Sequence, residues 1–272
     1  MVYCTKQPVK GVLPLKIRSL SVPAPVRAKI AVCADFHSVN RPMPVELALS
    51  LLAAAGPDLI LFPGDVFSDL RGGGVRDPYN ENGFRLVSGA ARIAPCFFSP
   101  GNHEMGVSRE NRRLLEEAGC TVLDNESVRR GDLTIGGLSS AYAGPKSGYR
   151  TPPEPNADFP ARFAEEPGYR ILLCHHPEYW RRTVVGRGIE LTVAGHAHGG
   201  QWRIFGRGVY APGQGLFPHY SSGLYRDSAQ ILAVSRGMTT SGRFVPRFFN
   251  PCEILLLTLA PETYAERRKW RK

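Results

Sequence analysis

Short apolar runs recur along the chain, most of them between Gly, Pro or polar residues. Apolar runs of about four to eight residues with such boundaries are typical of buried β-strands. Because several runs end in Asp, Asn or His, the predicted strands carry reactive groups at their carboxyl ends. The predicted strands are Ile30–Phe36, Leu59–Asp65, Cys96–His103, Ile171–His175, Leu191–His196, Ile231–Ser235 and Ile254–Leu259.

Three segments between these strands have the length and composition of helices. Val45–Ala55 is rich in Ala and Leu and is followed by a Gly-Pro pair, which ends a helix. Asn82–Ala94 and Arg109–Ala118 are further candidates. The alternation of strands and helices predicts an α/β protein, with little helix in the C-terminal third.

The chain is predicted to form one catalytic domain over residues 30–260, between an N-terminal arm at 1–29 and a basic tail at 261–272. Ala143–Gly168 and Phe205–Asp227 are rich in Gly or Pro and are expected to be long surface loops that carry specificity. The tail is expected to be solvated, and the alternative is a peripheral anchor on anionic membrane lipid.

The composition is that of a globular protein. Of the 272 residues 43% are hydrophobic and 21% charged, which excludes wholesale disorder, collagen and a membrane bundle. The 34 Lys and Arg exceed the 24 Asp and Glu, and the formal charge of +10 favours anionic partners. The codon usage of a GC-rich genome is an equally good reason for the arginine content.

The six cysteines predict a reducing compartment. They form no C-x-x-C pair, and Cys33, Cys96 and Cys174 interrupt apolar runs where a small buried side chain fits. The first residues lack the apolar segment of a signal peptide, and the longest weakly polar run, Leu47–Ala55, is too short to span a membrane. We expect a cytoplasmic protein, with peripheral membrane association as the alternative.

The polar groups at five strand ends are the pattern that predicts function. They form D-x-H, G-D, G-N-H-E, a single H and G-H-x-H, in this order. In open α/β sheets such groups gather at the carboxyl ends of the strands, so they are expected to converge. Six of the seven histidines lie in these segments, which argues against the alternative of scattered structural histidines.

These residue types predict a dinuclear metal site. Imidazole and carboxylate without thiolate select Mn, Fe or Zn, and one carboxylate can bridge two metals about 3.5–4 Å apart. Alternation along a strand places Asp35 and His37 on one face, and likewise the two histidines of G-H-x-H. The same rule turns His175 and His176 to opposite sides, so only one of them is expected to bind metal.

With these five motifs in order, the sequence resembles the calcineurin-like metallophosphoesterase superfamily over about residues 30–260. The resemblance implies a four-layer α-β-β-α sandwich of two mixed β-sheets flanked by helices. It implies two divalent metal ions that share Asp65, and a catalytic His103 that reaches the phosphate. The family's H-x-P block selects His175, because Pro177 follows by two. The implied ligands are Asp35, His37, Asp65 and His198 for one metal, and Asp65, Asn102, His175 and His196 for the other.

The residues after the last motif resemble one bacterial branch of this superfamily. The likeness is carried by Gly195–Gln201, by Ser235–Gly237 together with Thr240–Gly242, and by Arg247–Pro251. Members of the branch are small phosphohydrolases, some of them membrane-associated and linked to cell-envelope or lipid phosphoesters. Phe36 stands where the branch commonly has Leu or Ile. An N-terminal membrane segment, common in the branch, is not expected here.

The expected function is hydrolysis of phosphomonoester or phosphodiester bonds by direct attack of a metal-bridging hydroxide. The partner is an anionic phosphoester substrate, with a lipid- or nucleotide-linked group as a candidate. One alternative is a nuclease, which the charge suggests, although no aromatic-interleaved basic stretch supports nucleic-acid binding. The other is a metal-binding scaffold without turnover. The oligomeric state is not predicted.

Other residues carry weaker expectations. Glu104 is expected to cap the helix that follows it, and His176 to support the site without binding metal. Arg236 and Arg243 are expected either to contact substrate phosphate or to lie on the general surface. No role is expected for His219.

Overall fold

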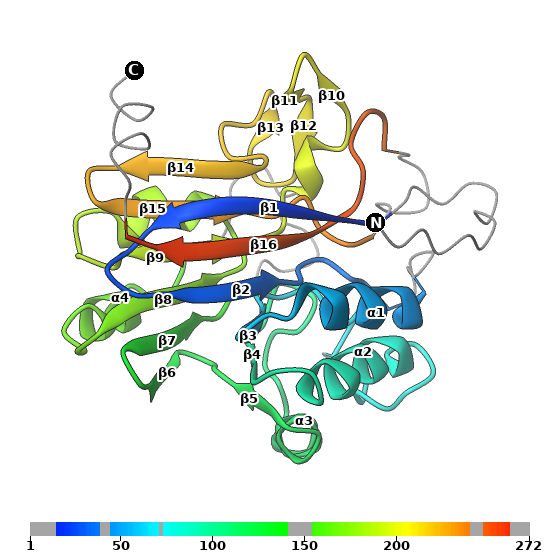
Figure 1. Ribbon diagram of the computed structural model, residues 1–272. Helices are drawn as coiled ribbons and strands as arrows, with labels where there is room; N and C mark the ends of the chain where they lie inside the picture. Colours follow the sequence, from blue (N-terminus) through cyan, green and yellow to red (C-terminus); the bar gives the residue numbers. More distant parts are fainter. Residues whose placement is uncertain (1–14, 39–43, 71–72, 141–153, 240–246, 262–272) are drawn as a thin grey trace.

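Two β-sheets stack face to face, with helices on their outer faces (Figure 1). The computed structural model describes residues 15–38, 44–70, 73–140, 154–239 and 247–261. Each of the two sheets has six strands, and four additional two-residue strands form two small hairpins beside them. The hairpins are β10 (Arg203–Ile204) with β11 (Arg207–Gly208), and β12 (Tyr210–Ala211) with β13 (Gly215–Leu216).

The first sheet has the strand order β1-β16-β2-β3-β4-β5. Strands β2 to β5 are parallel, whereas β16 runs antiparallel to β2 and parallel to the edge strand β1. Crossover helices connect the parallel strands. The bounds are β1 (Lys16–Pro23), β2 (Ala28–Val32), α1 (Val45–Ala55), β3 (Leu59–Phe62), α2 (Glu81–Ala91), β4 (Cys96–Phe98), α3 (Arg109–Glu117), β5 (Cys120–Val122) and β16 (Glu253–Ala260).

The second sheet has the order β14-β15-β9-β8-β7-β6. Its four inner strands are parallel, and both edge strands are antiparallel to their neighbours. The bounds are β6 (Glu126–Arg130), β7 (Leu133–Leu138), α4 (Asp158–Phe163), β8 (Tyr169–Cys174), a π-helical turn (Trp180–Val184), β9 (Leu191–Ala194), a 3-10 turn (His198–Gly200), β14 (Gly223–Asp227) and β15 (Gln230–Val234).

Three apolar clusters separate four layers. Successive side chains of β2 alternate between them, because Ile30 packs between the sheets and Ala31 packs with Leu52 of α1. On the outer face of the second sheet, Phe163 of α4 and Trp180 form the third cluster. The expected α-β-β-α sandwich of two mixed sheets is therefore confirmed. Its last layer is thin, because α4 has only six residues.

All the predicted strands and helices are present, and α1 has the predicted bounds. The prediction was wrong where it expected only loops. Phe205–Asp227 contains β11 to β14, and Ala143–Gly168 contains α4. Two-residue strands have no apolar periodicity to detect. The polar strand β6, with the sequence ESVRR, lacked an apolar run as well.

The expected arm at residues 1–29 includes β1, which pairs with β16 along its whole length, and the first residues of β2. That part of the arm belongs to the first sheet. The domain boundaries otherwise stay a prediction, and Arg243 and the tail from residue 262 lie outside the described residues.

No helix in the described segments is both long and apolar enough to cross a membrane. The described cysteines are buried free thiols: Cys33, Cys96, Cys120, Cys174 and Cys252.

Candidate metal centre

Both sheets deliver predicted site residues from the loops that follow their parallel strands. Each residue lies just beyond the carboxyl end of a strand, where active-site groups collect in α/β folds. They are Asp35 and His37 after β2, Asp65 after β3, Asn102 and His103 after β4, His175 after β8, and His196 and His198 after β9.

Four overlapping groups of three possible metal ligands lie in the described residues, and two of them, which share no residue, contain six of the predicted ligands. Within each group, one possible ligand atom from each residue lies within 4.8 Å of the others. One group is Asp35, His37 and His198, and the other is Asp65, His175 and His196.

Asp65 lies between the two groups. Its Oδ2 atom is 3.1 Å from His175 Nε2 in its own group and 3.8 Å from His37 Nε2 in the other. His196 Nδ1 lies 3.2 Å from His175 Nε2. In the first group, His198 Nε2 lies 3.9 Å from Asp35 Oδ1. One carboxylate oxygen therefore faces imidazoles of both groups.

His103 lies on the open side of the site. Its Nε2 atom is 4.0 Å from Asp65 Oδ2, and its ring meets His37 edge-on with centroids 4.9 Å apart. The His103 side chain is 37% exposed, against 6% for His37. Its Nδ1 lies 2.7 Å from the carbonyl oxygen of Ser68, and because a carbonyl only accepts, this nitrogen donates. The neighbouring Asn102 is buried on the same loop.

The two carboxylates each use one oxygen for the backbone. Asp35 Oδ1 accepts the His196 N–H at 2.9 Å, and Asp65 Oδ1 accepts the His103 N–H at 3.0 Å. Asp35 Oδ2 is buried and has no hydrogen-bond donor among the described residues. A buried carboxylate oxygen of this kind needs a compensating positive group. This donor set, with its uncompensated oxygen, fits a divalent cation.

Glycine is required at one position beside Asp35. A Cβ on Gly237 would lie 2.8 Å from Asp35 Oδ2, and the Gly237 φ of +79° also disfavours a side chain. The absence of a side chain at Gly237 thus allows its backbone to lie directly against the Asp35 carboxylate.

Five of the predicted ligands have left-handed backbone conformations. Their φ values lie between 45° and 63°, a region that few residues other than Gly adopt, with Asn, Asp and His the most frequent among those few. Backbone strain of this kind clusters at functional sites. The residues are Asp35, His37, Asp65, His196 and His198.

The strand-alternation argument for pairing Asp35 with His37 was therefore wrong, although the two side chains do converge. Strand β2 ends at Val32, and left-handed turns rather than an extended strand bring the two side chains together. His176 also departs from its expected opposite side, because its ring lies 4.1 Å from that of His196.

Burial keeps most of the imidazoles neutral. It lowers the pKa of His37 to about 3 and the pKa values of His196 and His198 well below the ordinary range. It raises the pKa of Asp35 to about 6. Neutral imidazoles offer the lone pair that a metal binds.

One charged pair stands among these neutral rings. Burial alone would raise the pKa of Asp65, but His175, His103 and His37 hold it well below its usual range. Burial alone would lower the pKa of His175, but Asp65 raises it to about 9. In the metal-free protein at neutral pH, His175 is thus protonated and paired with Asp65, and metal binding at His175 would require the loss of that proton.

Glu104 ties two ligand loops together. Its buried carboxylate accepts the backbone N–H groups of Asp65 at 2.8 Å, Gly101 at 2.7 Å and Phe67 at 2.7 Å. The expectation that Glu104 caps the next helix was wrong, because Ser108 caps α3. The place of Glu104 in the G-N-H-E motif is the sequence feature that could have indicated this positioning role.

Two further residues, to which the sequence analysis assigned no role, fix the loop that carries His198. Asn250 Nδ2 donates to the His198 carbonyl at 2.7 Å. Arg247 is buried, with Nη2 3.3 Å from His198 Nδ1, and it donates to the Arg236 carbonyl at 2.6 Å. Neither residue lies near the five motifs in sequence.

A model of the calcineurin-like phosphoesterase family matches residues 28–200, and the chain belongs to this family. The chain is 31% identical over 191 residues to the phosphodiesterase YaeI of Escherichia coli strain K12, covering 65% of this chain and 62% of that protein. It is 31% identical over 172 residues to a metallophosphoesterase of Helicobacter pylori, covering 62% of this chain and 44% of the relative. The chain thus spans about half of these relatives' length.

A crystal structure of the Thermus thermophilus protein TT1561 aligns with a TM-score of 0.47 and 14% identity, covering 79% of this chain and 92% of that chain. The family match confirms the superfamily resemblance that the five motifs predicted. The assignment of individual ligands stays a prediction.

Proposed function

We propose that this chain is a dinuclear-metal phosphohydrolase that cleaves phosphomonoester or phosphodiester bonds by direct attack of water on phosphorus. The observation that carries the proposal is the position of Asp65 Oδ2, 3.1 Å from His175 Nε2 and 3.8 Å from His37 Nε2. A carboxylate oxygen that faces both ligand groups is suited to bridge two cations.

The ligand sets are those that the family resemblance implies, and each of the two groups supplies three of the four ligands of one set. Asp35, His37, Asp65 and His198 would hold one cation, and Asp65, Asn102, His175 and His196 the other. The donors admit Mn, Fe or Zn. When bound, two such cations would supply a Lewis acid for the phosphoester oxygens and would lower the pKa of a bound water to about 7. The two carboxylates would leave the site positive and able to attract an anionic phosphate.

His103 would act on the substrate. Since its Nδ1 donates to Ser68, its Nε2 is left to face the open side of the site. From there, with Nε2 also protonated, the His103 imidazolium would stabilise the charge on the phosphate or give that proton to the leaving oxygen, a contribution of about 10²–10⁴-fold. Direct attack requires inversion at phosphorus.

The substrate class is an anionic phosphoester. The name of the Escherichia coli relative, a phosphodiesterase, favours a diester, and lipid-linked or nucleotide-linked groups are both candidates.

The test is hydrolysis of bis-p-nitrophenyl phosphate, p-nitrophenyl phosphate and single-stranded DNA with added Mn²⁺. We expect turnover of at least one nitrophenyl ester, its loss in Asp65→Asn, and its retention in His219→Gln, which changes an exposed histidine outside the site. Cleavage of DNA alone would instead indicate a nuclease. Two bound metals without any turnover would indicate a scaffold.

A further inference from the structure

Large apolar side chains gather on one exposed surface beside the metal centre. Ten large hydrophobic residues are exposed in the described part of the chain, and eight of them lie within 202–217 and 248–249. These residues, on the two small hairpins and the turn before β16, are called here the aromatic surface. Trp202 and Phe248 join its two segments, with ring centroids 5.7 Å apart.

Three phenylalanines of this surface are unfavourable in two ways. Phe205, Phe217 and Phe249 are 101%, 74% and 88% exposed, and their φ values are 47°, 52° and 52°. Asn or Gly suits a left-handed turn position, whereas a bulky residue there is an outlier. Neither solvation nor local backbone preference accounts for Phe at these positions. Contact with an apolar partner would account for them.

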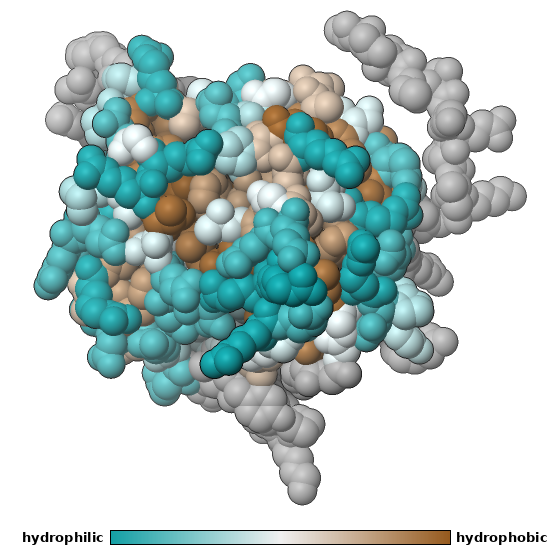
Figure 2. Space-filling model, turned by 90° about the horizontal axis from the view of Figure 1, so that it is seen from below, coloured by the Kyte–Doolittle hydropathy of each residue, from teal (hydrophilic) through white to brown (hydrophobic). Residues whose placement is uncertain are grey.

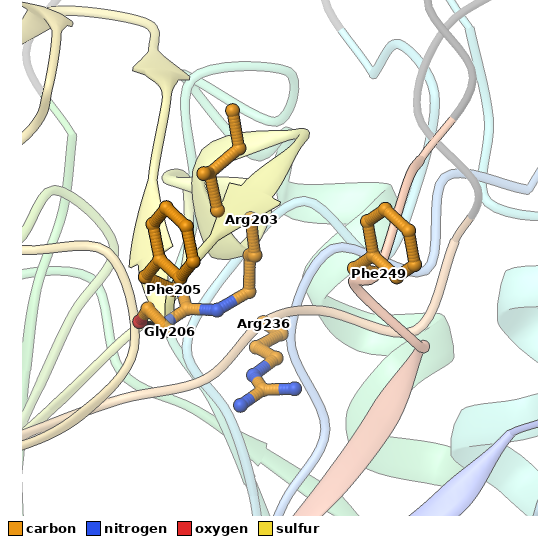
Figure 3. Close-up of a pocket in the computed structure, with 6 residues that line it drawn as sticks. Arg203, Phe205, Gly206, Arg236 and Phe249 are labelled. Carbon is orange, nitrogen blue, oxygen red and sulfur yellow. Dashed lines mark hydrogen bonds between the residues drawn. The ribbon is translucent and has the colours of Figure 1, made fainter.

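Arginines accompany the aromatic rings. A cavity of about 480 Å³ is lined by Arg203, Ile204, Phe205, Gly206, Arg236 and Phe249, with no acidic residue among them. Figure 3 shows Phe205 and Phe249 on opposite sides of this cavity, with the Arg236 guanidinium between them. From Leu191 to Cys252 the sequence has six arginines and a single acid, Asp227. The partner should therefore be both apolar and anionic.

The aromatic surface is attached to the metal centre. The Asn250 side chain, next to Phe249, donates to the carbonyls of His198 and Gln201. Arg236 precedes Gly237, which packs against Asp35. The side of the molecule that bears α3 lies away from the two small hairpins (Figure 1). Seen from that side, the surface is mostly hydrophilic with smaller hydrophobic areas (Figure 2).

We propose that the aromatic surface docks on an anionic lipid bilayer, with Phe205, Phe217 and Phe249 in the interface and Arg203 and Arg236 at lipid phosphates. Aromatic rings partition to the headgroup region, and basic side chains add electrostatic attraction to anionic lipid. A second copy of the chain fits poorly, because two arginine-rich surfaces repel each other. Docking deepens the proposed function, since it would bring the metal centre to phosphoesters at the bilayer.

The test measures co-sedimentation of the full chain with vesicles of phosphatidylcholine, with or without phosphatidylglycerol. We expect binding only to the anionic vesicles, and a loss of affinity of about tenfold or more in the variant F205N/F217N/F249N. Because Asn tolerates left-handed backbone, this variant should melt no lower than the wild type. Tyr79→Asn is the control, since Tyr79 is 70% exposed and lies outside the aromatic surface.

Equal vesicle binding by the wild type and the triple variant would overturn the proposal, as would no binding by the wild type. Self-association that the triple variant abolishes, without vesicle binding, would assign the surface to a second copy of the chain. Every variant retains residues 262–272, so the basic tail contributes equally. Hydrolysis of bis-p-nitrophenyl phosphate should be unchanged in the triple variant. If the wild-type protein bound anionic vesicles but had no hydrolase activity, the proposed hydrolase function would be contradicted and the docking proposal would stand.

Discussion

The Glu104 carboxylate accepts the backbone N–H of Asp65 at 2.8 Å, so the residue after the predicted catalytic histidine fixes the carboxylate that is proposed to bridge the two cations. The same oxygen accepts the Gly101 N–H at 2.7 Å. One buried side chain thus joins the loops that follow β3 and β4.

Glu104→Gln tests this positioning role. An amide keeps the shape but presents an NH₂ group to one of three backbone donors, which leaves a buried N–H unsatisfied. We expect the free energy of unfolding to fall by about 1–3 kcal/mol and metal affinity to fall by about 10–100-fold. Calorimetric titration with Mn²⁺ and thermal denaturation measure the two effects. Glu46→Gln, an exposed acid on α1, is the control, and equal metal affinity in both variants would contradict the role.

The His175–Asp65 pair predicts that the stability of the metal-free protein depends on pH. Since the pKa of His175 rises from 6.5 to about 9 on folding, its contribution to stability is full below about pH 6.5 and is lost as the pH rises through 9. In EDTA, the melting temperature should therefore fall between neutral pH and pH 9 by more in the wild type than in His175→Gln. Parallel curves for the two proteins would show that the pair contributes nothing.

Strain at the ligand loops predicts an unusual order of stability at His37. Gly normally destabilises a protein relative to Ala, because it has more freedom in the unfolded chain. At the His37 φ of 46° the order should reverse, with His37→Gly more stable than His37→Ala by about 1 kcal/mol. Urea unfolding in EDTA compares the two variants, which lose the same imidazole. A more stable Ala variant would exclude strain at this position.

The close approach of Gly237 to Asp35 predicts a specific loss of metal. In Gly237→Ala the new Cβ would lie 2.8 Å from Asp35 Oδ2 and displace the carboxylate, whereas Gly186 has a similar φ of +85° and nothing within 4 Å of its added Cβ. Both variants bear the strain, but only Gly237→Ala should bind less metal per chain. Elemental analysis after dialysis measures the bound metal, and the same metal content in both would refute the displacement.

The sequence predicted the strands whose residues form an uninterrupted apolar run. Such a strand is buried on both faces, and its continuous apolar sequence can be recognised without knowledge of its neighbours. It missed the edge strands β1, β6 and β14, the three-residue strand β5, and the inner strand β7, in which Thr and Gly interrupt the apolar run. It also missed the small hairpins, which depend on turn glycines and contacts with neighbouring loops.

The site residues were found through motif order rather than through strand geometry. The left-handed turns at Asp35 and His196 follow from tertiary packing, and no local pattern reports them. Arg247 and Asn250 contact the His198 loop across about fifty residues of sequence. Such long-range partners could not be inferred from one chain.

The proposed function requires Asp65 to bridge two cations. Anomalous diffraction from crystals grown with Mn²⁺ tests it most directly. We expect two peaks about 3.5–4 Å apart, one beside His37 and one beside His175, with Asp65 between them. A single peak, or two peaks that Asp65 does not contact, would contradict it.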